Sequence, residues 1–226
     1  MPNSATDDLQ KLKDRYESTI TPAETVPQST VIFKKLLDLP PIPQHIIDLC
    51  IERYSTREYF PENHGSYKQR VLKNWKGKYN GAVGRIQRGQ VSDEFDEWAR
   101  EHIGPGFHEA GVGWIDVKPD TPPSIGGHTD RTRSAVVGYN IFQGGPDAEI
   151  TFWRERGHDY LRTTRGLSYE NDQDLEPVYS TRDWTGCWYW LNPQVIHGLE
   201  NITEPYMDIT VDYNVLPEKI RRILEG

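Results

Sequence analysis

Three residues, His128, Asp130 and His197, combine types and spacing that suit a metal centre. His128 and Asp130 stand two positions apart just before a predicted strand, and alternate residues of a strand point to the same side. Their imidazole nitrogen and carboxylate oxygen can therefore reach one ion. The third ligand must come from elsewhere, and His197, which follows another predicted strand and a Pro-containing turn, is the best candidate. Two histidines and one carboxylate on one face leave positions open, as in non-haem Fe(II) oxygenases.

The spacing of His128 and Asp130 is a weak signal on its own, because such pairs occur by chance. Its context adds weight: Gly126 and Gly127 precede the pair, a predicted strand follows it, and the distal His197 stands at the head of a turn before the last predicted strand. The alternative is an ordinary hydrogen-bonded loop pair. Surface or core roles are expected for the other five histidines, which fall on predicted helices and loops: His45, His64, His102, His108 and His158.

The elements that must position these residues are short strands. Runs rich in Val, Ile, Tyr, Trp and Thr, separated by Gly- and Pro-containing turns, predict a mainly β sandwich or barrel. The expected strands span 111–117, 134–142, 149–154, 186–191 and 207–213, and the expected helices span 44–54, 93–102 and 216–224. Residues 1–30 form a polar arm, and the charged stretch 155–185 is expected to form loops over one mouth of the barrel.

Composition excludes several classes of function for this chain of 226 residues. The net charge of −8 argues against gripping duplex nucleic acid, which needs a basic face. The sequence has no apolar run long enough to predict a membrane span, and no apolar segment of a secretory signal. Cys50 and Cys187 are the two cysteines, and they favour free thiols and a cytoplasmic location over a disulfide. Zinc-finger and nucleotide-loop motifs are absent.

Over about residues 110–215, the chain resembles the Fe(II)/2-oxoglutarate-dependent oxygenases, and among them the prolyl-hydroxylase-like branch. The resemblance is carried by His128-Thr129-Asp130, the strand at 133–140, the segment 186–193, His197 and the strand at 209–211. It implies a double-stranded β-helix, or jelly roll, within one domain at 31–226, with flanking N-terminal helices and a short C-terminal helix. It also implies Fe(II), O2 and 2-oxoglutarate as reactants, with His128, Asp130 and His197 as the catalytic metal ligands.

The chain departs from this branch at Tyr206. The family places an Arg or Lys nine residues beyond the distal histidine, where it pairs with the far carboxylate of 2-oxoglutarate. A dianion buried without a cation is costly, so another base must reach in. Arg133 is the first choice, with Arg131 and Arg154 in reserve. Without such a base, either a different co-substrate binds or catalysis has been lost.

Strand alternation extends the candidate set. Gly138 would leave room beside the metal, and Asn140 would hydrogen-bond the co-substrate or else serve the core. With Arg133, Asn140 and Tyr206 are therefore the candidate co-substrate residues. If the polar face of the last strand points inward, Asp208 or Asp212 would favour a cationic substrate.

A small molecule or a peptide side chain is the expected substrate, and neither duplex nucleic acid nor a membrane is an expected partner. The sequence does not indicate an oligomeric state. Two other functions stay open: a cupin-like metal protein of different chemistry, and a non-catalytic binding module on the same scaffold.

Overall fold

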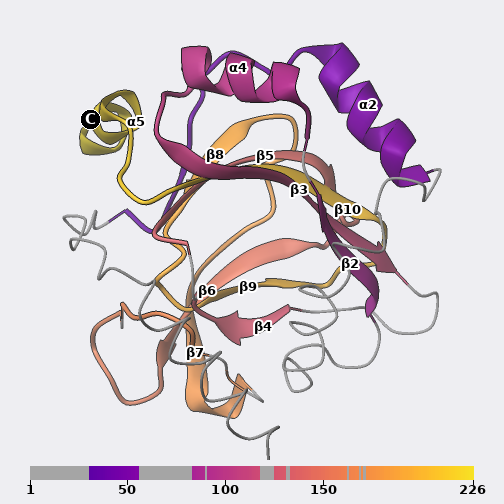
Figure 1. Ribbon diagram of the computed structural model, residues 1–226. Coiled ribbons are helices and arrows are strands. Elements are labelled where there is room, and N and C mark those ends of the chain that lie inside the picture. The colour runs from indigo at the N-terminus through magenta and orange to yellow at the C-terminus, as the bar shows by residue number, and fades with distance from the viewer. Residues whose placement is uncertain are drawn as a thin grey trace, which may run out of the picture.

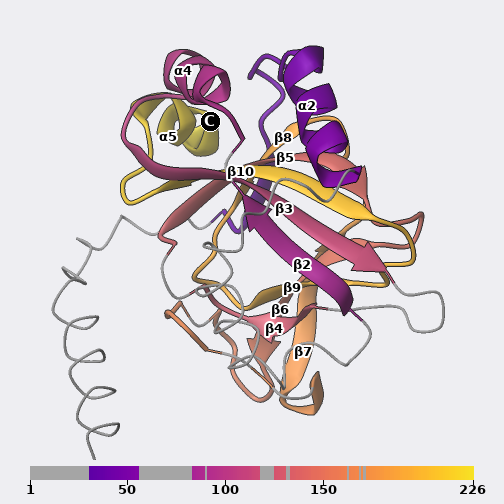
Figure 2. The same ribbon diagram turned by 45° about the vertical axis from the view of Figure 1, so that its right-hand side comes forward.

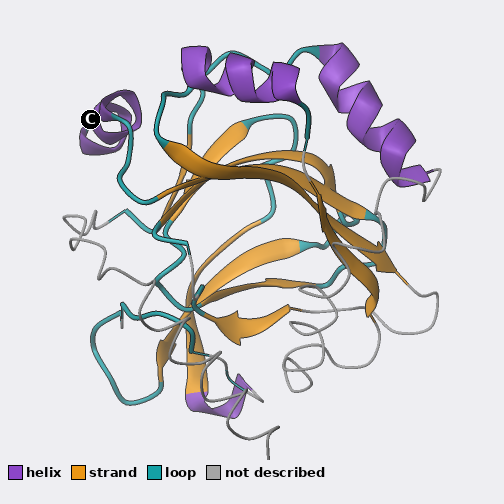
Figure 3. Cartoon of the chain, viewed as in Figure 1, coloured by secondary structure: helices purple, strands orange, loops and turns teal. Residues whose placement is uncertain are grey.

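The computed structural model describes residues 31–55, 83–89, 91–117, 125–130, 133–161, 163–167, 169 and 172–226. In these residues the protein is mainly β, with two antiparallel sheets and three helices, as expected (Figures 1 and 3). The arm predicted at 1–30, and Arg131 and His64 with it, lie outside the described residues. Within the described part of the chain, none of the helices is both long and apolar enough to cross a bilayer.

The larger sheet has six strands in the order β1-β8-β5-β10-β3-β2. Its long central strands pair over most of their length, with one register irregularity in each pair, and Thr210 of β10 lies opposite Gly138 of β5 and Gly111 of β3. The strands are β1 (Phe33–Lys35), β2 (Val83–Gly89), β3 (Phe107–Val117), β5 (Ala135–Gln143), β8 (Trp188–Leu191) and β10 (Tyr206–Tyr213).

The smaller sheet has four strands in the order β4-β9-β6-β7. These strands are β4 (Ile125–His128), β6 (Glu149–Glu155), β7 (Leu175–Thr181) and β9 (His197–Glu200). From β8 to β10 the chain passes from the larger sheet to the smaller one and back, so each sheet is built from segments that are distant in sequence.

Three helices lie on the outer side of the larger sheet: α2 (Gln44–Ser55), α4 (Asp93–His102) and α5 (Glu218–Glu225) (Figures 1 and 2). Ser92 caps α4 as its sequence predicts, because its hydroxyl accepts a hydrogen bond from the backbone N–H of Phe95 (3.0 Å). The apolar faces of these helices pack on alternate residues of the central strands. This cluster includes Ile46, Phe95, Ile220, Val137, Met207, Ile209, Val211 and Tyr213.

A second apolar cluster fills the space between the two sheets. Its members include Ile115, Ile150, Phe152, Tyr189, Leu199 and Tyr206. Because strand residues alternate, β10 sends one set of side chains to the helices and the other set between the sheets. The second set contains Tyr206, Asp208, Thr210 and Asp212, and all four are buried. The sequence leaves open whether this polar set of β10 faces the interior or the solvent, and in the structure it faces the interior.

One part of the expected architecture is wrong. The stretch 155–185 is not all loop, because it contains β7, which pairs with β6 along most of its length. Residues 83–89, for which the sequence predicts no element, form the edge strand β2. In both cases pairing with a neighbouring strand, rather than local sequence, determines the conformation.

Candidate metal centre

The metal-ligand candidates meet where β4 and β9 pair. His128 ends β4 and lies directly opposite His197, the first residue of β9. The two strands approach closely at Gly198, where a Cβ atom would lie 2.1 Å from the backbone oxygen of Ile125. Beyond β4, the backbone N–H of Asp130 donates to the carbonyl of Pro193 (2.7 Å), which ties Asp130 to the turn before His197.

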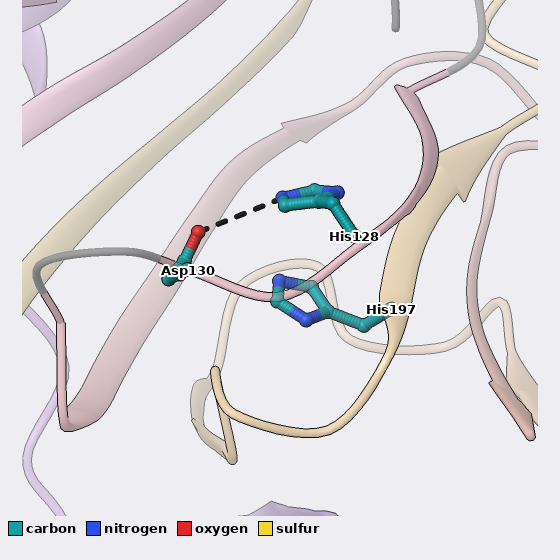
Figure 4. A group of neighbouring side chains, drawn as sticks. All are labelled: His128, Asp130 and His197. Carbon is teal, nitrogen blue, oxygen red and sulfur yellow. Dashed lines mark ion pairs between the residues drawn. The ribbon is translucent and has the colours of Figure 1, made fainter. Parts of the chain in front are cut away.

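Figure 4 shows the three side chains pointing toward one another. One ligand atom from each of His128, Asp130 and His197 lies within 4.8 Å of the other two. Nε2 of His128 is 3.6 Å from Oδ1 of Asp130, and the two imidazole rings are 4.5 Å apart between centroids. All three residues are buried, with 6–7% of their surface exposed. The predicted triad is therefore brought together, and its donor set suits a divalent transition metal.

Both imidazoles are oriented by backbone carbonyls. Nδ1 of His128 contacts the carbonyl of Gly126 (3.0 Å), and Nδ1 of His197 contacts the carbonyl of Val195 (2.8 Å). A carbonyl only accepts, so each Nδ1 carries the proton and each Nε2 keeps its lone pair for a metal. The ring of Phe152 lies 6.1 Å from that of His197 and packs beside it.

Electrostatics keep two of the three ligands ready to bind a cation. Burial alone would raise the pKa of Asp130, but the neighbouring Arg133 and both histidines hold that pKa well below its usual range. Burial and the nearby His128 lower the pKa of His197 to about 3. At neutral pH the site therefore contains an ionised carboxylate and a neutral His197, which are the forms that ligate metals.

The backbone from the end of β4 to Asp130 is held by hydrogen bonds to a neighbouring segment of the chain. The backbone N–H of Thr129 donates to the carbonyl of Leu167 (3.0 Å), and its hydroxyl accepts from the Leu167 N–H (2.9 Å). The N–H groups of Gly166 and Tyr169 donate to the carbonyls of Asp130 and Gly127. Gly166, Leu167 and Tyr169 thus hold the end of β4 and the residues after it, which carry His128 and Asp130.

Arg133, the candidate partner for the far carboxylate of 2-oxoglutarate, lies next to the triad. It pairs there with Asp130, which is itself a candidate metal ligand. Its guanidinium is 2.6 Å from Oδ2 of Asp130 and 3.9 Å from Oδ1 of Asp212 on β10. Burial disfavours its charge, yet the two carboxylates outweigh this and raise the pKa of Arg133. Of the two reserves, the described one, Arg154, instead pairs with Glu176 across β6 and β7.

Asn140, a candidate co-substrate residue, has its amide engaged by the strands. Its Nδ2 donates to the carbonyls of Phe142 (3.1 Å) and Met207 (3.2 Å), and its Oδ1 accepts from the hydroxyl of Thr185 (3.0 Å). It stands beside the irregularity in register between Met207 and Asp208, and it stabilises that bulge. These contacts correspond to the core role that the sequence left open.

The space next to Gly138 is occupied by the side chain of Tyr189 and not by a metal site. A Cβ atom there would lie 2.3–2.7 Å from atoms of the Tyr189 ring. Gly138 therefore makes room for the phenol of Tyr189, and the expectation that it leaves room beside a metal is wrong.

Tyr206, at the position expected for a base, belongs to a buried cluster on β8 and β10. The hydroxyls of Tyr189 and Tyr206 both donate to Oδ2 of Asp208, each at 3.1 Å. Burial and the charge of Asp208 raise the pKa of both phenols, so they stay protonated donors. In the larger sheet, Asp208 of β10 pairs with Gly113 of β3, and Gly113 pairs with Arg88 of β2.

Two contributors to the site escape prediction from sequence. From sequence, Asp212 is expected only as a possible contact for a cationic substrate, and Thr129 is only the residue between two ligands. The sequence feature that could have indicated a role for Asp212 is strand alternation, which puts it on the same face of the last strand as Asp208 and Thr210. A second group, His108, Glu109 and Asp212, also has ligand atoms within 4.8 Å of one another, with His108 and Glu109 exposed. His45 and His102 lie on helices and His158 on a loop, as expected, but His108 lies on strand β3, so its expected place on a helix or loop is wrong.

Comparison of the sequence with known protein families and with curated proteins finds no match. The geometry of the three ligands therefore carries the functional argument.

Proposed function

We propose that this chain is a mononuclear iron(II) dioxygenase that uses a 2-oxo acid to oxidise a small molecule or a peptide side chain. The observation that carries the proposal is the convergence of Asp130 with two imidazoles whose Nδ1 atoms are anchored to carbonyls. The alternation of the chain between two antiparallel sheets supports a double-stranded β-helix as the fold.

The residues present fit an iron(II) ion. His128 and His197 would hold it through Nε2 and Asp130 through Oδ1, and this donor set leaves positions for co-substrate and O2. Bound iron would supply the activation of O2, while the protein supplies orientation and a buried setting. In the net reaction, one oxygen atom joins a substrate carbon and the other joins the 2-oxo acid, which loses CO2.

The far carboxylate of 2-oxoglutarate fits the described residues less well. The position expected for its cation is Tyr206, whose hydroxyl already donates to Asp208. Arg133 is the basic side chain that contacts the triad within the described part of the chain, and it is paired with Asp130. The family resemblance thus implies 2-oxoglutarate as the co-substrate. The alternative co-substrate is a 2-oxo acid without a second carboxylate.

The cluster of Tyr189, Tyr206 and Asp208 also favours one alternative function. A tyrosine in place of the expected cation, hydrogen-bonded to the carboxylate of Asp208, is what a metal-binding protein without 2-oxoglutarate chemistry would tolerate. In that case the scaffold and the metal centre persist, but no 2-oxo acid is decarboxylated.

The test is an anaerobic titration of 2-oxoglutarate, and in parallel of pyruvate, into protein loaded with Fe(II). A weak metal-to-ligand charge-transfer absorption, followed by CO2 release when O2 is admitted, is the expected result. His197→Ala should abolish both signals, and His45→Ala, a change to an exposed histidine on α2, should preserve them. Metal binding without either signal for any 2-oxo acid would favour the alternative.

A further inference from the structure

The two oxygens of Asp130 have different neighbours. Oδ1 faces Nε2 of His128 at 3.6 Å, on the side where the triad converges. Oδ2 lies 2.6 Å from the guanidinium of Arg133, three residues further along the chain. A carboxylate can bind a metal through one oxygen or through both, and here the second oxygen already has a cationic partner.

Arg133, which lies just before β5, also has a carboxylate neighbour on the adjacent strand β10. Its other terminal nitrogen is 3.9 Å from Oδ1 of Asp212, which is fully buried on β10. The guanidinium therefore spans from the loop after β4 to the central strand of the larger sheet. Its side chain is 21% exposed, and its charge is permanent. The cation is fixed between two carboxylates, so it cannot readily swing away from Asp130.

We propose that Arg133 is a positioning residue of the metal centre, which holds Oδ2 so that Asp130 offers only Oδ1 to the ion. This inference rests on the proposed metal site and deepens it. A carboxylate bound through both oxygens would occupy a fourth position of an octahedral ion and leave two open positions instead of three. Arg133 thus preserves room for a chelating co-substrate and O2 together. In this role it is not the anchor of a far carboxylate.

Metal affinity alone cannot test this role, because removing Arg133 has two opposing effects. Loss of the cation takes away a repulsion for the divalent ion and strengthens binding. Loss of the ion pair also frees Asp130 to move and leaves Asp212 buried without this partner, which weakens the site. The number of waters on the bound metal separates the two effects, because it reports how many positions the protein occupies.

The experiment measures water-proton relaxation of protein loaded with Mn(II), without any 2-oxo acid. Three bound waters are expected for the wild type and two for Arg133→Met, so the relaxation enhancement should fall by about one third. Arg154→Met, which removes a guanidinium paired with Glu176 across β6 and β7, should keep the wild-type value.

A second variant covers the case in which Arg133→Met does not fold. Arg133→Lys keeps a positive charge near the two carboxylates, but its ammonium ends one bond short of the nitrogen that contacts Oδ2. It should therefore also bind fewer waters than the wild type.

Three waters in either variant would overturn the proposal, above all if the affinity for 2-oxoglutarate fell at the same time, since Arg133 would then be a co-substrate anchor. Failure of the wild type to bind Mn(II) would instead refute the metal centre itself, and this inference with it. Metal binding without turnover would count only against the dioxygenase.

Discussion

Replacing Thr129 with Val tests whether the contact with Leu167 holds the backbone between His128 and Asp130 in place. Thr129 lies between two ligands, is 2% exposed, and makes a reciprocal pair of hydrogen bonds with the backbone of Leu167. Valine has the same shape as threonine but cannot accept from the Leu167 N–H. Its backbone N–H can still donate, so the variant removes one of the two bonds.

The cost follows from the donor that is left behind. A buried N–H without a partner costs about 1–3 kcal/mol, and because Leu167 is only partly buried we expect about 1–2 kcal/mol. For a chain of this length, that lowers the melting temperature by roughly 2–8 °C. Thr129→Ser keeps the acceptor and loses one methyl group, at about 0.8 kcal/mol. Valine should therefore be the more destabilising change although it is the more apolar residue.

Urea denaturation of the metal-free wild type and both variants measures the difference. We expect the midpoint to fall in the order wild type, Thr129→Ser, Thr129→Val, with an unchanged slope. If Thr129→Val is as stable as Thr129→Ser, or more stable, the hydrogen bond between the hydroxyl and Leu167 does not stabilise the site. The account of how the ligands are held would then be refuted.

Further predictions concern the ligands and the strands around them. In the metal-free protein the pKa of His197 is about 3, against about 6.5 in the unfolded chain, so the unfolded state binds the extra proton between these values. The free energy of unfolding should thus fall as pH drops below about 6.5, by up to about 1.4 kcal/mol per pH unit, and His197→Asn should flatten the urea-midpoint profile between pH 7 and pH 5. Gly198→Ala puts a Cβ atom 2.1 Å from a backbone oxygen of β4 and should cost about 2–3 kcal/mol in thermal unfolding. Gly157→Ala, with a φ of +83° and no atom within 4 Å, should cost only about 1 kcal/mol, and equal losses would contradict the close approach of β4 and β9. Tyr206→Phe removes a buried donor to the Asp208 carboxylate and should cost about 1.5–3 kcal/mol; a neutral result in urea denaturation would show that this hydrogen bond adds no stability.

The sequence alone identified the features that depend on local pattern. His128 and Asp130 were predicted as ligands because a spacing of two at the end of a strand puts side chains on one side, and His197 because it follows a predicted strand and a Pro-containing turn; the structure brings the three together. The mainly β architecture and the three described helices were predicted from short apolar runs, turn residues and caps. These signals lie within a few residues of one another, so they can be read from sequence.

Only the tertiary structure decided which groups surround the ligands. The pairing of β4 with β9 sets the two imidazoles side by side, and the pairing of β5 with β10 brings Asp212 near Arg133, which lies just before β5. The interior face of β10 could not be chosen from its alternation, because both faces alternate equally well until a neighbouring sheet covers one of them. Partners that lie more than seventy positions apart, such as Arg133 and Asp212, meet only when distant strands pair, and no local pattern records that pairing.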